Sequence, residues 1–288
     1  HPPDRDHLGP QQHGVGGAAG DEAVTLKYHT SPEIKNTNPS TTHNKVMAIS
    51  DIYTDHITFF ADILGFKNKI SNKDPNEAYN ILKAAEIISR LNPEINGQKV
   101  KISQFSDSIA ITYAIDTEIN KNIAKYGKEI QEFFSLAGYC FWCFLQHGGM
   151  IRGSITFGSL HHQGNRIFGP ALVEAHYLES KTAKYPRIII SKYLRDKLID
   201  IEIENYIKCD DDGIYFVDVL CDKYKTYEYQ DEQNKCWPFH RNKKTYCKEK
   251  YTFIQDFIKN IYTEIPPENN DSERIFEKIN WLNKYSKC

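Results

Sequence analysis

The spacing of apolar and polar residues predicts an α+β fold. Short runs rich in β-branched and aromatic residues favour strands, and apolar residues that recur at every third or fourth position favour helices. The predicted elements, in chain order, are a strand over 57–63, a helix over 75–91, a hairpin of two strands within 100–115, a long helix over 120–146, a strand over 150–160, a helix over 168–180 and a strand over 187–191. The order β-α-β-β-α-β-α-β is close to a ferredoxin-like sandwich, a mostly antiparallel sheet with flanking helices and, here, extensions.

Three regions are expected along the chain. Residues 1–46 are rich in Pro and Gly and hold few large apolar side chains, so we expect them to be disordered or not native, with Met47 as the natural start. Residues 47–205 carry the α+β pattern. Residues 206–288 shift to Tyr, Lys and acidic residues and end in an amphipathic helix around Trp281; we expect them to pack on the core as an extension.

Composition excludes several classes of protein. The 288 residues hold 36 basic and 38 acidic side chains, a net charge of −2, which argues against a dedicated nucleic-acid binder. The longest apolar run, 133–145, is shorter than the roughly 18–20 residues that span a bilayer, so no membrane segment is expected. The seven cysteines are odd in number and scattered, and no signal peptide is visible. These features favour a reduced, cytoplasmic protein.

Two aspartates in apolar surroundings are the main candidates for chemistry. Asp62 lies inside a run of apolar residues, and Asp107 lies at the tip of the predicted hairpin. An ionised carboxylate in such a setting is unfavourable unless it is paired or metal-bound. Carried on neighbouring strands, the two acids could share divalent cations through oxygen ligands. The alternative is that each aspartate caps a turn.

Other polar patterns favour structural roles. Cys140 and Cys143 have redox-like spacing but lie in an apolar helix, which favours buried small side chains. The set Cys236, His240 and Cys247 lacks a fourth zinc ligand. The pair His161-His162 is predicted at the surface, near the base-reading position discussed below.

Four segments, in order, resemble class III nucleotidyl cyclases. They are the strand 59–66 with its Asp-Ile-Leu-Gly-Phe core, the hairpin 105–108, the strand 151–158 and the helix start 167–175. Together they cover residues 55–192, about half of the chain. The sequences Phe-Gly-Pro-Ala at 168–171 and Leu-Glu-Ser at 178–180 are most similar to those of the pyrimidine cyclases of bacterial Pycsar antiphage systems.

The resemblance implies a metal site and a phosphate site. Asp62, Asp107 and the backbone carbonyl of Ile63 would bind two divalent cations, Mn²⁺ or Mg²⁺. Ala61, Gly65 and Phe66 would contact the substrate, with Gly65 permitting close approach of the backbone to the phosphates.

The resemblance also implies which residues read the base. In the purine cyclases a Lys or Glu contacts the base, and the matching residue here is Ser103. The residue that matches their second base contact is Arg166. A short Ser and a long Arg suit a pyrimidine with a carbonyl at position 2, although Arg166 could equally be a solvated loop residue. The usual Asn and Arg of the next helix correspond to Val173 and Tyr177.

Another cation must therefore stabilise the transition state if the chain is active. Arg152, Lys181 and Lys184 are candidates; Arg152 is preferred because its strand faces the site, and the alternative is an ordinary surface ion pair. His176 is a further candidate contact to the substrate.

The expected activity is conversion of UTP, preferred over CTP, to the 3′,5′-cyclic monophosphate and pyrophosphate. The resemblance implies a head-to-tail homodimer and a product read by a separate effector in antiphage defence. Two alternatives remain open: a degenerate cyclase fold that binds nucleotide and signals, and a purine nucleotide cyclase.

Overall fold

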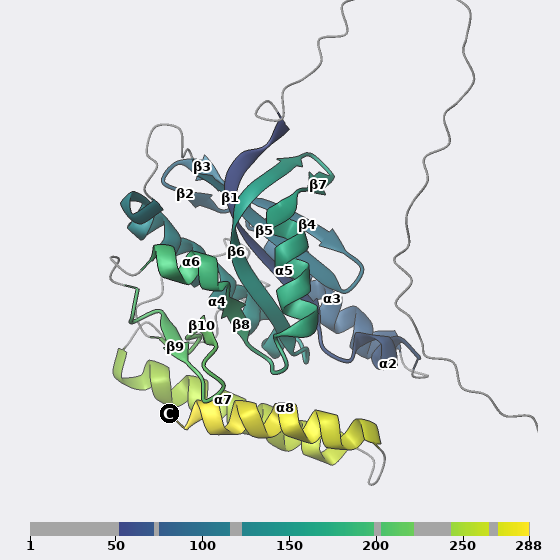
Figure 1. The fold of residues 1–288 in the computed structure, drawn as a ribbon. Helices are drawn as coiled ribbons and strands as arrows, with labels where there is room; N and C mark the ends of the chain where they lie inside the picture. The colour runs from purple at the N-terminus through teal and green to yellow at the C-terminus, as the bar shows by residue number, and fades with distance from the viewer. Residues whose placement is uncertain are drawn as a thin grey trace, which may run out of the picture. The chain divides into compact units, whose positions relative to one another are not determined.

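An eight-stranded sheet forms the centre of the fold, with strands in the order β4-β5-β1-β6-β8-β10-β9 and β7 paired with β6 (Figure 1). The computed structural model describes residues 52–71, 75–115, 123–198, 203–221, 243–264 and 270–287. Within this sheet only β6 and β8 pair in parallel. Its strands are β1 (Thr54–Ile63), β4 (Lys101–Phe105), β5 (Ser108–Ile115), β6 (Ile151–Gln163), β7 (Arg166–Phe168), β8 (Ile188–Ile190), β9 (Ile207–Cys209) and β10 (Tyr215–Val217). The predicted α+β class, with a mostly antiparallel sheet flanked by helices, is confirmed.

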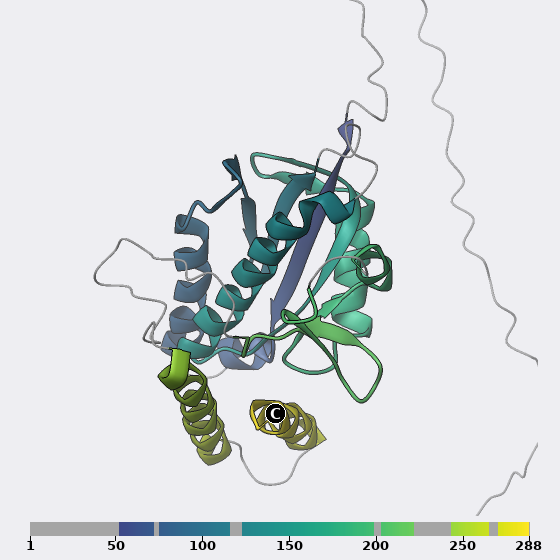
Figure 2. The same cartoon turned by 90° about the vertical axis from the view of Figure 1, so that its left-hand side faces the viewer.

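Helices cover both faces of the sheet (Figure 2). The helices are α2 (Phe66–Ser71), α3 (Pro75–Arg90), α4 (Gly127–Gln146), α5 (Pro170–Lys181), α6 (Lys192–Lys197), α7 (Lys243–Glu264) and α8 (Asn270–Ser286). Helices α3 and α4 lie on one face and α5 lies on the other. Helix α4 is nearly all buried, and both Cys140 and Cys143 are fully buried in it, as predicted.

Strand alternation divides β1 between these two faces. Ile57, Phe59, Ala61 and Ile63 belong to the main hydrophobic core, whereas Phe60 belongs to a small cluster with residues of β5 and α5. Even-numbered residues of β1 therefore face α5, and this face ends at Asp62.

Element boundaries differ from the sequence prediction at two helices. The helix predicted from 168 begins at Pro170, because Phe168 ends β7 and Gly169 has a φ of 143° that only glycine adopts readily. The long helix predicted from 120 begins at Gly127, after the short helix η1 (Ile123–Tyr126). The Asn-Gly turn at 96–97 joins the small strands β2 (Glu94–Ile95) and β3 (Gln98–Lys99).

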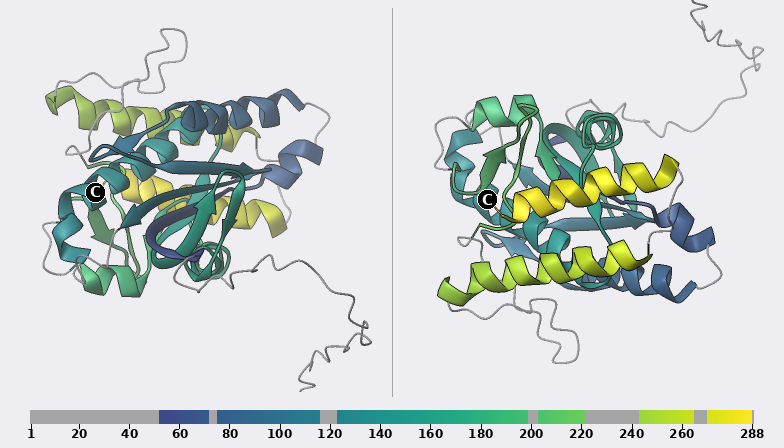
Figure 3. Two further views of the ribbon diagram at one scale, coloured as in Figure 1. Left: turned by 90° about the horizontal axis from the view of Figure 1, so that it is seen from above. Right: turned by 90° about the horizontal axis from the view of Figure 1, so that it is seen from below.

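The chain after residue 205 continues the sheet before it forms helices. Strands β9 and β10 add to the edge next to β8, and α7 and α8 lie side by side (Figure 3). Two predictions lie outside the residues whose side chains are described: the one for residues 1–46 and the one for Cys236, His240 and Cys247. None of the described helices has the length and apolar character needed to cross a membrane.

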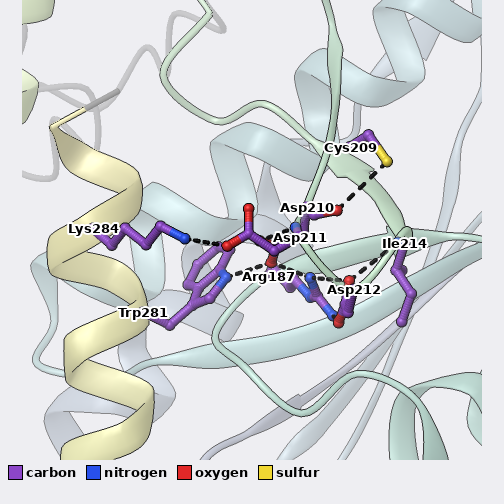
Figure 4. Close-up of polar contacts among 8 residues, drawn as sticks. All are labelled: Arg187, Cys209, Asp210, Asp211, Asp212, Ile214, Trp281 and Lys284. Carbon is purple, nitrogen blue, oxygen red and sulfur yellow. Dashed lines mark hydrogen bonds and ion pairs between the residues drawn. The ribbon is translucent and has the colours of Figure 1, made fainter.

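A buried arginine connects α8 to the sheet. Arg187, immediately before β8, is fully buried and forms ion pairs with Asp210 and Asp212 of the loop between β9 and β10 (Figure 4). Trp281 of α8 donates a hydrogen bond to Asp210, and Lys284 pairs with Asp211. The guanidinium also lies 5.8 Å from the Trp281 ring centroid. Polar contacts and stacking therefore hold the C-terminal helix in place.

Two glycines of β6 test how closely β6 packs against its neighbours at the centre of the sheet. A Cβ atom added at Gly153 would lie 2.7 Å from the Phe60 carbonyl oxygen, whereas one at Gly158, on the same strand, would lie 3.7 Å from the Ala171 Cβ. We expect Gly153→Ala to lower the free energy of unfolding by about 1–3 kcal/mol because the neighbouring backbone must move. Gly158→Ala is the matched control, with an expected change below about 1 kcal/mol. Urea denaturation measures both, and equal effects would contradict the register of β1 and β6.

Candidate functional site

Asp62 lies at the end of β1 on the face that α5 covers in part. The sheet register places it between Ser108 of β5 and Arg152 of β6. Ser108 donates a hydrogen bond from its hydroxyl to Asp62 Oδ1 at 3.1 Å. The carboxylate is partly buried and has one described hydrogen-bond donor, so it retains acceptor capacity for another ligand.

Asp107 lies in the tight turn that joins β4 to β5. Ser106, its neighbour, has a φ of 53°, a left-handed conformation that makes the turn possible. The backbone N–H of Ile63 donates to the Asp107 carbonyl oxygen at 3.1 Å, so the turn is attached directly to the end of β1. The two aspartates therefore lie at the same end of neighbouring strands, as predicted.

The charges of this region act on one another. The pKa of Asp62 is raised from 3.8 to about 6: burial is the largest cause, the negative charges of Asp107 and Glu179 add to it, and Ser108 and Arg152 oppose it. Two carboxylates that disfavour each other's ionisation are stabilised by a nearby cation. The electrostatics thus favour a positive ligand between Asp62 and Asp107.

Glu179, on α5, is a buried acid that the sequence prediction missed. It is 3% exposed, and Arg152 donates from Nε to its Oε1 at 2.5 Å. Burial raises the pKa of Glu179, and Arg152 opposes this increase. The pair is not the surface ion pair considered as the alternative, because the acid is buried. The spacing Ala171, Ala175, Glu179 follows one helix face and would have indicated its burial.

The donor set fits a hard divalent cation. Among the described residues no group of three or more His, Cys, Asp or Glu side chains is arranged to hold a metal. Mg²⁺, however, is usually bound by one or two carboxylates together with water and substrate phosphates. Asp62, whose pKa the charge of Asp107 helps to raise, and Asp107 match this kind of site, and the Ile63 carbonyl lies in the same segment.

The predicted substrate contacts at the end of β1 and the start of α2 differ in which groups are accessible to a ligand. The side chains of Ala61, Ile63 and Phe66 are buried in the main core, so only their backbone groups remain for a ligand. Gly65 is exposed in the turn before α2, with a φ of 74°. A ligand can therefore approach the backbone at Gly65 without meeting a side chain of that residue.

Ser103, on β4, lies in a polar cluster on the same face. His162 bridges two strands: its Nε2 lies 2.9 Å from the Ser103 hydroxyl, and its Nδ1 lies 2.7 Å from the Thr112 hydroxyl. His162 is 4% exposed, so the prediction that His161 and His162 both lie at the surface is wrong for His162. The curled end of β6 returns this residue over the sheet, which local sequence does not reveal.

The other predicted contacts are exposed. Arg166 lies on β7, and His176 and Lys184 lie on or just after α5. The His176 ring contacts the Phe60 ring edge-on at 5.5 Å, and its charge lowers the pKa of Glu179. His176 therefore joins the Asp62 region. No hydrogen bond within the described chain connects Arg166 or Lys184 to Asp62 or Ser103.

An apolar surface lies beside these residues on α5. Val173 is 69% exposed and Tyr177 is 60% exposed, and both line a shallow pocket with Tyr53 and Pro170. Burial raises the pKa of Glu174, which lines the same pocket. Large apolar side chains this exposed are typical of surfaces that contact another molecule.

Comparisons with known proteins gave only remote likenesses. No protein-family profile and no curated protein matches the chain. A bacterial light-regulated adenylyl cyclase aligns with 61% of this chain and 54% of its own, at 13% identity and a TM-score of 0.40. A class III adenylyl cyclase-like ATP-binding protein from Pseudomonas aeruginosa aligns with 55% of this chain and 39% of its own, at 15% identity and a TM-score of 0.37.

The guanylate cyclase domain of a rhodopsin-guanylyl cyclase from Catenaria anguillulae, in complex with GTP, aligns with 57% of this chain and 96% of its own. The identity is 16% and the TM-score is 0.37. The chain spans about half the length of the first of these structures. At such scores the likeness carries no conclusion about activity.

The raised pKa of Asp62 predicts a pH dependence of stability in metal-free buffer. The folded protein holds the Asp62 proton more tightly than the unfolded chain does, so this group weakens the fold as pH rises from about 4 through 6. We expect Asp62→Asn to be more stable than the parent by about 1–2 kcal/mol at pH 8 and to lose this advantage at pH 4. Denaturation with a chelator present measures the difference; a constant difference across this range would contradict the electrostatics.

Proposed function

We propose that the protein is a metal-dependent nucleotidyl cyclase that acts on a pyrimidine nucleoside triphosphate. The observation that carries the proposal is the pair Asp62 and Asp107, held at the same end of neighbouring strands, where burial and the charge of Asp107 disfavour the ionised form of Asp62. The resemblance of the surrounding motifs to class III cyclases selects this chemistry among those that such a pair supports.

In the proposed reaction the ribose 3′-hydroxyl attacks the α-phosphorus. A new oxygen–phosphorus bond forms, the bond to pyrophosphate breaks, and the hydroxyl proton is released. Two divalent cations, Mn²⁺ or Mg²⁺, would be held by Asp62, Asp107 and the Ile63 carbonyl, and would supply activation of the hydroxyl and neutralisation of phosphate charge. The protein residues then contribute mainly positioning and electrostatic stabilisation.

Arg152 is the proposed transition-state cation. Its side chain is 25% exposed beside Asp62, and Glu179 takes only the Nε–H among the five guanidinium donors. The remaining donors suit the oxygens of a phosphate. Under this proposal Glu179, on α5, orients the guanidinium through its hydrogen bond with Nε.

Ser103 is the proposed base-reading residue, with Arg166 as a second. Ser103 pairs with Ala110, which pairs in turn with Phe60, two residues before Asp62 on β1. It therefore lies two strands across and two residues along from Asp62, a diagonal of about 12 Å. A nucleotide laid across the sheet from Asp62 to Ser103 would place phosphates and base at these two ends. We propose UTP over CTP as the substrate.

The active form is proposed to be a head-to-tail homodimer with two equivalent sites. Support comes from the exposed apolar side chains of α5, Val173 and Tyr177, and from exposed Phe105 at the end of β4. In the antiphage systems that the sequence resembles, the cyclic product signals to a separate effector, and we propose the same role for this product.

One observation favours a second candidate function. Val173 and Tyr177 stand where the resembling family has Asn and Arg, and both are exposed rather than directed at Asp62 from within the chain. A non-catalytic module that binds nucleotide and signals by assembly would tolerate this change. Such a module would bind UTP or CTP and release no pyrophosphate.

Turnover of the four nucleoside triphosphates tests the proposal. With Mn²⁺, we expect UTP to yield cyclic UMP and pyrophosphate, with lower turnover of CTP, identified by mass spectrometry. Asp62→Ala and Asp107→Ala should each lower turnover at least about 100-fold, because each removes a metal ligand. Gly158→Ala, away from the acids, is the control and should retain activity. Turnover of ATP alone, or undiminished activity in either aspartate variant, would contradict the proposal.

Arg152 is tested separately from its partner. We expect Arg152→Ala to lower kcat by about 100–1,000-fold, the loss typical when one donor to a developing oxyanion is removed. The double variant Arg152→Ala, Glu179→Gln removes the unpaired buried charge as well. If Arg152 contacts phosphate, the double variant stays inactive although its stability recovers; recovery of activity with stability would show that Arg152 only neutralises Glu179.

A further inference from the structure

His162 is a buried imidazole held between the hydroxyls of two neighbouring strands. Ser103 of β4 contacts its Nε2 at 2.9 Å, and Thr112 of β5 contacts its Nδ1 at 2.7 Å. Lys101 donates from its ammonium group to the His162 backbone carbonyl, which fixes the backbone of the curled end of β6 over the sheet. The ring is therefore positioned at both nitrogens and through its backbone.

The ring is neutral near pH 7. The pKa of His162 is lowered to about 4, mainly by burial and also by the positive charges of Lys101, His56 and His161. A neutral imidazole has one N–H donor and one acceptor nitrogen, so its two hydroxyl neighbours cannot play the same role. One hydroxyl must donate to the ring, and the other must accept from it.

Thr112 determines which nitrogen carries the proton. Its side chain is 1% exposed, and among the described residues the only hydrogen-bond partner of its hydroxyl is His162 Nδ1. The Thr58 hydroxyl, opposite Thr112 on the neighbouring strand β1, is buried and has no hydrogen-bond partner in the described part of the chain, so it does not accept the Thr112 proton. A buried hydroxyl proton without an acceptor is destabilising by about 1–3 kcal/mol. The Thr112 proton is therefore directed at Nδ1, and the ring proton lies on Nε2.

Ser103 then has a defined polarity. Its oxygen accepts from Nε2–H, so its own proton is free to point away from the ring. The Ser103 side chain is half-buried and lies on the same face of the sheet as Asp62. Ser103 thus offers a hydrogen-bond donor to a ligand on this face.

We propose that His162 is a positioning residue that fixes Ser103 as a donor to a carbonyl oxygen at position 4 of the pyrimidine base. This inference rests on the proposed function. Uracil has a carbonyl oxygen at position 4, whereas cytosine has an amino group, which is itself a donor. With cytosine, the Ser103 oxygen can accept from the amino group only through its remaining lone pair, and the Ser103 proton is then left without an acceptor. The network therefore favours UTP over CTP.

Two substitutions at His162 separate hydrogen bonding from packing. His162→Gln retains an N–H that reaches Ser103, whereas His162→Phe fills the volume without a hydrogen bond. We expect His162→Phe to lower the ratio of kcat/KM for UTP to that for CTP about tenfold, the equivalent of one hydrogen bond. His162→Gln should retain the ratio within about threefold. Equal loss in both variants, with equal thermal stability, would contradict the proposal.

A double variant tests whether His162 acts through Ser103. Ser103→Ala should lower the UTP to CTP ratio to the level of His162→Phe, and adding His162→Phe to Ser103→Ala should lower it no further. A further decrease of similar size in the double variant would overturn the assignment, because His162 would then act by another route.

The tautomer is measured independently of activity. Long-range ¹H–¹⁵N NMR spectra of the ring nitrogens of His162 at pH 7 should show Nε2 protonated and Nδ1 unprotonated. Protonation on Nδ1 would overturn the inference whatever the substrate is. If no nucleotide is turned over, the proposed function and the base recognition fail together, while this spectrum still decides the polarity of Ser103.

Discussion

One backbone hydrogen bond, from the Ile63 N–H to the Asp107 carbonyl, joins the two segments that carry the candidate metal ligands. It attaches the turn between β4 and β5 to the end of β1, where Asp62 lies. It extends the pairing of β1 with β5, in which Asp62 lies opposite Ser108, to the turn that carries Asp107. With it, the charge of one acts on the other and raises the pKa of Asp62. The same constraint that disfavours the ionised form of Asp62 makes the pair a favourable site for a cation.

Helix α5 completes the region on the face of the sheet where Asp62 lies. Its Glu179 holds Arg152 beside Asp62, and its Ala175 packs against Phe60. Strand β6 is connected in turn to the C-terminal region, because Gly153 donates its backbone N–H to the Arg187 carbonyl at 3.0 Å. The ion pairs of Arg187 that secure α8 are thus one strand away from the site. Helix α8 is therefore connected through Arg187 to Gly153, the residue that follows Arg152 on β6.

The sequence predicted the elements that local spacing determines. Helix α3, the hairpin of β4 and β5 and the strand that carries Asp62 all follow from short periodic patterns. The missed features depend on residues far apart in the chain. The start of α5 was wrong because Phe168 pairs with the curled end of β6. The burial of His162 and Glu179 was missed because their partners, Ser103 and Arg152, lie 59 and 27 residues away.

Anomalous diffraction at the manganese edge tests the central claim most directly. Crystals of the full chain grown with Mn²⁺ and a non-cyclisable UTP analogue should show manganese peaks at coordination distance, about 2.0–2.6 Å, from carboxylate oxygens of both Asp62 and Asp107. Peaks on one aspartate only, or elsewhere in the chain with both aspartates free, would contradict the shared site and with it the enzyme assignment.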